Sequence, residues 1–102
     1  MLELRPNCEC CDKDLPVDST EAMICTYECT FCNKCVDEIL ENVCPNCGGG
    51  FVPRPIRPKM ARRSGVGLEY QPASTERVHT KYSVDELREF SNTTKHTKPE
   101  NR

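Results

Sequence analysis

Cysteines are the residues of this chain whose type and spacing point most directly to chemistry. There are nine, and all of them lie within residues 1–47. Two cysteines separated by two residues can fold back as a tight turn that places both sulfurs on one ion, and two such turns complete a tetrahedral site. Eight of the nine fall into four closely spaced pairs: Cys8 and Cys11, Cys25 and Cys29, Cys32 and Cys35, Cys44 and Cys47. The pattern predicts two zinc ions, each held by four cysteines.

Disulfide bonds are the competing explanation for these cysteines, and the sequence disfavours them. The chain starts Met-Leu-Glu-Leu-Arg-Pro, with no basic stretch followed by an apolar run, so we expect no secretory signal peptide. An odd number of cysteines fits a fully paired secreted framework poorly, and clustered cysteines in a reducing cytosol more often bind metal. No segment approaches the roughly 18 apolar residues of a membrane span. We therefore expect a cytoplasmic protein with no membrane contact.

One cysteine and two histidines remain as candidates for chemistry. Cys10 stands between two predicted ligands, and we expect it to be free because Cys8 and Cys11 have the favoured spacing. A hydrogen-bond donor to a ligand sulfur, a redox-sensitive thiol and a competing ligand all stay open as its role. His79 and His96 have no cysteine, serine or carboxylate cluster around them in the sequence. We therefore expect no catalytic centre and a protein that is not an enzyme.

The composition explains why the chain would need metal. It has 102 residues, of which 36% are apolar, with three tyrosines, three phenylalanines and no tryptophan. Domains of fewer than about 70–80 residues rarely build enough apolar core to fold alone, and need disulfides, metal or a partner. We expect metal to replace the missing core in the half that carries the cysteines.

Charge divides the chain near a run of three glycines, Gly48–Gly50. Residues 1–50 carry three basic and ten acidic side chains, whereas residues 51–102 carry eleven basic and six acidic ones. Closely spaced prolines after residue 52 block helix formation and favour an extended linker. The expected division is a zinc-binding domain at 1–52, a Pro/Arg-rich and polar linker at 53–81, a short capped helix at 82–91 and a disordered C-terminus at 92–102.

The positions of helices and strands follow from local patterns. Ser83 and Glu86 form a capping box, which predicts the start of the last helix, although so short a helix must dock on something or fray. In the zinc-binding domain at 1–52, which we call the head, we expect short strands around 23–25 and 30–31. We also expect the side chains of Tyr27 and Phe31 to fill the space between the two metal ions. A helix near 36–42 is indicated by apolar residues at helical spacing: Val36, Ile39, Leu40 and Val43. The predicted fold class is a small α+β zinc-stabilised domain.

The order of the cysteine spacings, including the final Cys44-Pro45-Asn46-Cys47, resembles that of RING-type zinc fingers. The resemblance covers residues 8–47 and implies a cross-brace with interleaved ligands and all-cysteine sites. By that resemblance, one zinc takes Cys8, Cys11, Cys32 and Cys35, and the other takes Cys25, Cys29, Cys44 and Cys47. The chain is also similar to a family of short cysteine-rich bacterial proteins catalogued as a domain of unknown function. That second resemblance lies in residues 2–11, 24–32, 44–49, 51–58 and 72–75.

These features leave four functions open. A zinc-stabilised module that binds another protein is favoured, because four protein ligands close each site to substrate. Ubiquitin-ligase activity is implied by the RING resemblance, but that family has a hydrophobic residue after the first ligand and often a basic residue after the eighth. Here Glu9 and Gly48 occupy those places, and only the proline after the seventh ligand, Pro45, is kept.

The third function depends on the basic residues after residue 50, a part of the chain that we call the tail, and the fourth depends on the identity of the metal. Nucleic acid could bind the basic segment 54–63, whose cations would neutralise phosphates: Arg54, Arg57, Lys59, Arg62 and Arg63. Electron transfer would need iron, which four cysteines can also hold. The spacing of Cys29, Cys32, Cys35 and Cys44 does not match an iron–sulfur cluster run, which requires three residues before the last cysteine. The oligomeric state is left open.

Overall fold

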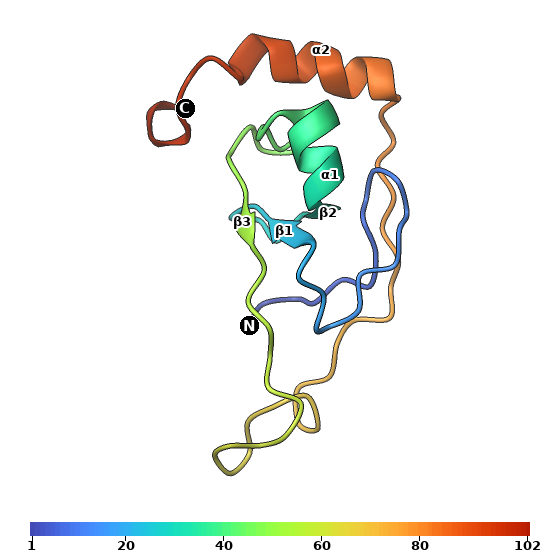
Figure 1. Ribbon diagram of the computed structural model, residues 1–102, viewed down its shortest axis with the longest axis vertical. Helices are drawn as coiled ribbons and strands as arrows, with labels where there is room; N and C mark the ends of the chain where they lie inside the picture. Colours follow the sequence, from blue (N-terminus) through green and yellow to red (C-terminus); the bar gives the residue numbers. More distant parts are fainter.

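Three short strands form an antiparallel sheet in the middle of the molecule (Figure 1). The computed structural model describes residues 1–102. The strands are β1 (Ala22–Ile24), β2 (Thr30–Cys32) and β3 (Val52–Pro53), in the order β2–β1–β3. The two strands predicted in the head are confirmed to within one residue. The third was not predicted, and the expected boundary between residues 52 and 53 falls inside it.

A helical segment follows β2 directly. It begins as α1 (Asn33–Cys35) and continues as η1 (Val36–Leu40), which has wider π-type turns. The helix ends because Glu41 and Asn42 adopt left-handed backbone angles, with φ of 47° and 61°. The helix predicted near 36–42 is therefore present, but it starts and stops earlier than expected. Together with the sheet it confirms a small α+β fold.

The core is built from cysteines as much as from apolar side chains. Phe31 is fully buried, and its ring meets that of Phe51 edge to face with centroids 5.4 Å apart. The prediction for Tyr27 is wrong: its side chain is 72% exposed, because it lies in the turn before Glu28, which has a φ of 67°. Six of the thirteen residues in the main buried cluster are cysteines: Cys8, Cys25, Cys29, Cys32, Cys35 and Cys44.

Residues 72–81 run back along the head, although the sequence predicts a loosely ordered linker there, whereas residues 57–71 project from it as a loop (Figure 1). Main-chain hydrogen bonds join the two parts, from Ser74 N to Leu4 O at 3.1 Å and from Thr80 N to Glu9 O at 2.7 Å. These contacts use backbone groups, which leave no signature in the sequence. They bring the chain back to the end of the head where α1 lies (Figure 1).

The last long helix, α2 (Val84–Thr94), lies across η1. Its start is as predicted, since Ser83 Oγ accepts from Glu86 N and Glu86 Oε1 accepts from Ser83 N. Leu87 is 2% exposed against η1, which docks the helix. The helix extends beyond the predicted end at residue 91, and η2 (Pro99–Asn101) follows where a disordered end was expected. No helix in the structure combines the length and the apolar character needed to cross a membrane.

Candidate metal centre

The first cysteine set is complete in the structure. Its sulfur atoms all lie within 4.8 Å of one another, and Cys11 Sγ is 3.8 Å from Cys32 Sγ. A tetrahedral zinc ion with Zn–S distances of about 2.3 Å separates neighbouring sulfurs by about 3.8 Å, so the set fits such an ion. Its members are Cys8, Cys11, Cys32 and Cys35.

The second set is gathered more loosely. Three of its sulfurs, those of Cys25, Cys44 and Cys47, lie within 4.8 Å of one another. The fourth expected member, Cys29, is not within that distance of all three, but its thiol is in hydrogen-bonding contact with Cys44 and Cys25. It also accepts a hydrogen bond from Asn46 Nδ2 at 3.4 Å. The structure thus groups three of the four expected sulfurs of the second set, with Cys29 beside them.

The local backbone explains why these pairs can converge on an ion. The residues directly after Cys11 and Cys47 are Asp12 and Gly48, and both adopt a left-handed backbone, with φ of 62° and 77°. Each turn also directs a backbone N–H at a sulfur, from Cys11 to Cys8 Sγ at 3.5 Å and from Gly49 to Cys47 Sγ at 3.4 Å. Such donors stabilise the negative charge of a thiolate. The helical start of α1 places the third and fourth sulfurs of the first set on one side, because residues three apart share a helix face.

The two sets interleave along the chain. The first set combines the N-terminal turn with the end of β2 and α1, and the second combines the end of β1 with the turn after η1. Neither set can form until both hairpin strands and the helix are in place. The metal centre and the fold are therefore one structural unit.

Burial controls the protonation of these thiols. It raises the pKa of Cys8 and of Cys25 to about 11. Contact with the Cys44 thiol lowers the pKa of Cys29 to about 5, while the same contact raises the pKa of Cys44. The buried sulfurs thus hold protons that a metal ion must displace, so metal affinity should fall as the pH falls.

Cys10 belongs to neither cluster of sulfurs. It is half-buried beside the first set, and burial raises its pKa even though the Cys35 thiol approaches it. His79 and His96 are both exposed and lie outside the two sets.

Two polar residues that support the sets were not predicted. The Glu9 carboxylate is buried, where it accepts from Arg5 Nη1 at 2.7 Å and from Thr30 N at 2.5 Å. Burial raises the pKa of Glu9. Asn46 was overlooked because the resemblance leaves its position between Pro45 and Cys47 unspecified. The signal that could have indicated its role is a side-chain amide, a hydrogen-bond donor, between two residues of a predicted metal-binding turn.

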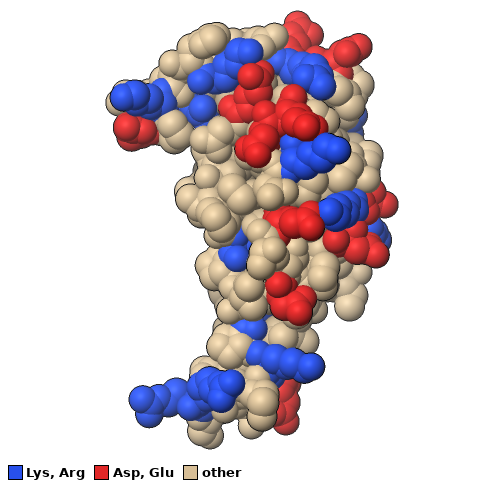
Figure 2. All heavy atoms as spheres, in the orientation of Figure 1, with Lys and Arg blue, Asp and Glu red and all other residues tan.

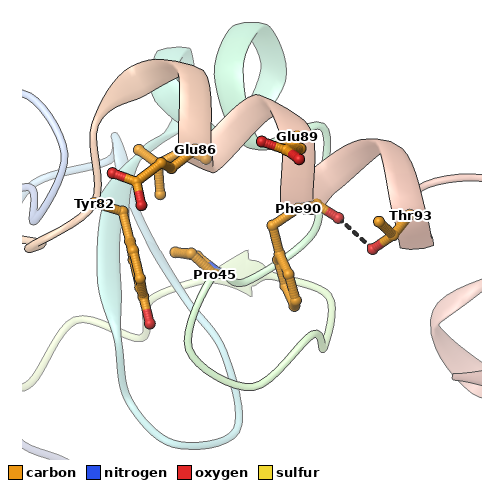
Figure 3. A pocket seen from close by; sticks show the side chains of 7 residues that line it. Pro45, Tyr82, Glu86, Glu89, Phe90 and Thr93 are labelled. Atoms are coloured by element: carbon orange, nitrogen blue, oxygen red, sulfur yellow. Dashed lines mark hydrogen bonds between the residues drawn. The ribbon is translucent and has the colours of Figure 1, made fainter.

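A groove lies beside the second set, between the Cys44–Cys47 turn and α2. It encloses about 360 Å³, and Figure 3 shows Tyr82 and Phe90 on either side of Pro45, with Glu86 and Glu89 above it on the helix. Lys81 Nζ lies 5.5 Å from the centre of the Tyr82 ring. The groove thus combines aromatic walls with a carboxylate rim.

Known proteins match the head and part of the chain beyond it. Residues 1–57 match a family described as a protein of unknown function, DUF1272. An uncharacterized protein of Rhizobium meliloti (strain 1021) is 59% identical over 78 residues, which cover 76% of this chain and 86% of that relative. No solved structure matches the chain. Because the matched region includes both cysteine sets and more than half of the chain, this protein belongs to the DUF1272 family.

Proposed function

We propose that the chain is a zinc-binding module, with a RING-like cross-brace, that docks another protein in the cytoplasm. The observation that carries the metal part is the first cysteine set, whose four sulfurs have the spacing of a tetrahedral site. Such a set fills every coordination position with protein, so the ion would stabilise structure and not activate water. Reduced cysteines also suit a cytoplasmic setting. We propose Cys29 as the fourth ligand of the second site.

Metal analysis tests this proposal directly. Protein purified without added metal should contain about two zinc ions per chain and be colourless, because zinc has a filled d shell. Iron in an all-cysteine site would colour the protein and support electron transfer in place of a structural role. A chain that holds no metal at all would exclude both readings.

The groove beside Pro45 is the surface that we propose for the partner. Its aromatic walls suit an apolar or cationic side chain, since cations bind over aromatic faces, and Lys81 already lies over Tyr82. Glu86 and Glu89 add negative charge at the rim of the groove. We propose an occupant with an arginine or lysine side chain, presented by an extended segment of another protein.

Selection from a peptide library with a fixed central arginine tests the groove. Peptides selected on the metal-loaded chain should lose about tenfold in affinity when Phe90→Ala removes one wall, because aromatic anchors dominate such sites. Glu89→Gln should weaken binding, whereas Glu69→Gln, the same charge change on another part of the chain, should not. Peptides that bind Phe90→Ala as tightly as the native chain would exclude this groove.

Ubiquitin-ligase activity has less support than docking. Of the positions that the RING family uses, Glu9 is buried in hydrogen bonds and Pro45 is buried below α2. The Glu9 side chain is therefore not available to a partner enzyme, and α2 leaves only the groove open to Pro45. We therefore keep a non-catalytic role as the proposal.

A further inference from the structure

The structure separates the five basic residues of segment 54–63 into two groups with different roles. Arg54 is 5% exposed and donates to three carbonyl oxygens of the head. Arg57 donates to Gln71 O and to Leu2 O, both at 2.7 Å. These two guanidinium groups are already used to hold the chain together, so they are not free to bind a ligand.

The other three basic residues lie on a loop that we call the basic loop, residues 57–71. Its shape is fixed by internal hydrogen bonds: Gly67 N donates to Gln71 Oε1 and Gln71 Nε2 donates to Gly65 O, both at 3.0 Å. Gly67 also packs so closely on Pro58 O that an added Cβ would lie 3.2 Å from it. The loop is therefore a built structure, closed at its base by Arg57.

Lys59, Arg62 and Arg63 are exposed on this loop. All six ion pairs of the structure involve other residues, so no carboxylate neutralises these three cations. Arg62 and Arg63 border a hollow of about 410 Å³ whose lining also includes Gln71. Tyr70, on the same loop, is 53% exposed. Figure 2 shows basic side chains projecting at the narrow end of the molecule.

We propose that the basic loop binds the phosphate backbone of single-stranded nucleic acid. Arginine guanidinium groups match phosphate oxygens with paired donors, and an exposed aromatic ring can stack on a base. This binding site is independent of the metal sites and of the groove at α2. It lies at the opposite end of a molecule that is 46 Å long (Figure 1).

The main objection is the acidic head, but most of its acidic side chains gather over the broad part of the molecule in Figure 2, away from the narrow end. Charges separated by more than the Debye length, about 8 Å at physiological ionic strength, are largely screened from one another. Most of the acidic side chains belong to residues 1–50, whereas the basic loop carries four basic residues and only Glu69 as an acid. A phosphate chain at the loop would therefore meet a locally positive surface.

Fluorescence anisotropy with a labelled oligo-dT of about a dozen nucleotides tests the proposal on the full metal-loaded chain. Three cations that displace counterions from a single strand give a slope of log K against log salt of about −2. Replacing Arg62→Gln and Arg63→Gln together should reduce the magnitude of that slope to about 0.7 and weaken binding in low salt. Lys98→Gln, an exposed charge change elsewhere, should leave both unchanged.

Three results would overturn the proposal. They are no binding in low salt, equal loss of binding in Lys98→Gln and in the double variant, or binding to vesicles containing phosphatidylserine without binding to the oligonucleotide. The last result would assign the loop to a membrane surface. Circular dichroism and metal content, unchanged in the variants, would show that lost binding is not lost folding.

Discussion

Arg54 is a buried arginine that faces carbonyl oxygens and no carboxylate. Its Nη1 donates to Arg5 O at 2.8 Å, and its Nη2 donates to Leu15 O and Pro16 O at 3.3 and 3.1 Å. Burial lowers its pKa. From the sequence, Arg54 was counted among the residues that could bind nucleic acid, because charge alone does not reveal which arginines become buried. Its position directly after β3 lets its side chain join the residues after the strand to the N-terminal part of the head.

We expect Arg54→Met to destabilise the fold by about 2–3 kcal/mol, because hydrogen bonds to a charged group are lost and three carbonyls are left buried. Chemical denaturation of the metal-loaded protein measures this change. Arg62→Met serves as the matched control, since an exposed side chain should change the free energy of unfolding by no more than about 0.5 kcal/mol. Equal effects of the two substitutions would mean that the hydrogen bonds of Arg54 contribute nothing.

Cys10 and Cys32 should differ sharply in their contribution to metal binding. Cys32→Ser removes a sulfur from the complete set, so we expect the loss of one zinc per chain and unfolding of the head. Cys10→Ser should retain both ions, because Cys10 lies outside the two sets. Metal analysis after gel filtration measures both variants. If Cys10→Ser lost an ion, the set that contains Cys8 and Cys11 would have to be reassigned.

At the scale of elements, a local signal predicted the start of α2 correctly, whereas the end of that helix depends on distant contacts. The capping box of Ser83 and Glu86 is formed as the sequence indicated, because both partners lie within four residues. The end of α2 at Thr94 was not foreseen, since it depends on distant contacts such as Ser91 Oγ donating to Leu40 O at 2.8 Å. Likewise, β3 was not predicted because it is defined by its antiparallel pairing with β1, which is distant in the sequence.

Docking of α2 depends on Leu87. Leu87→Ala should cost about 2–5 kcal/mol of packing free energy and detach the helix, because an isolated helix of this length is marginal. Hydrogen exchange of the α2 amides should then become fast while the head stays protected. Val84→Ala, on the same helix at a side chain that is 45% exposed, should leave exchange nearly unchanged. A helix that remained protected in Leu87→Ala would show that other contacts hold it.

At the scale of the whole molecule, the opposite charges of the two halves help to hold the tail against the head. Basic residues of the tail contact the head at several points: Arg77 bonds Asp12 and Asp14, Lys95 pairs with Glu41, and Arg102 donates to Asn42 O. The sequence revealed the charge division and the cysteine pairs, which depend on composition and spacing. It could not reveal the path of the tail, because that path follows from main-chain hydrogen bonds and three-dimensional proximity.

Removal of metal should therefore unfold the head and release the tail together. Six of the thirteen residues in the main buried cluster are cysteines, and without ions they would pack only as small apolar side chains with no bonds joining them. Zinc binding in small domains supplies about 10–16 kcal/mol, comparable to the whole stability of a typical domain. We expect a strong chelator to abolish the circular dichroism signal of the native fold.

Trypsin gives an independent readout of that release. In metal-loaded protein, cleavage should begin at the exposed Arg62 and Arg63, whereas the peptide bond after Lys34, inside α1, should resist. After chelation, the bond after Lys34 should be cleaved as fast as the bond after Arg62, because α1 unfolds with the head. The same chelator saturated with zinc beforehand is the control. Protein that is free of metal yet still protected at Lys34 would show that the fold does not require the ions.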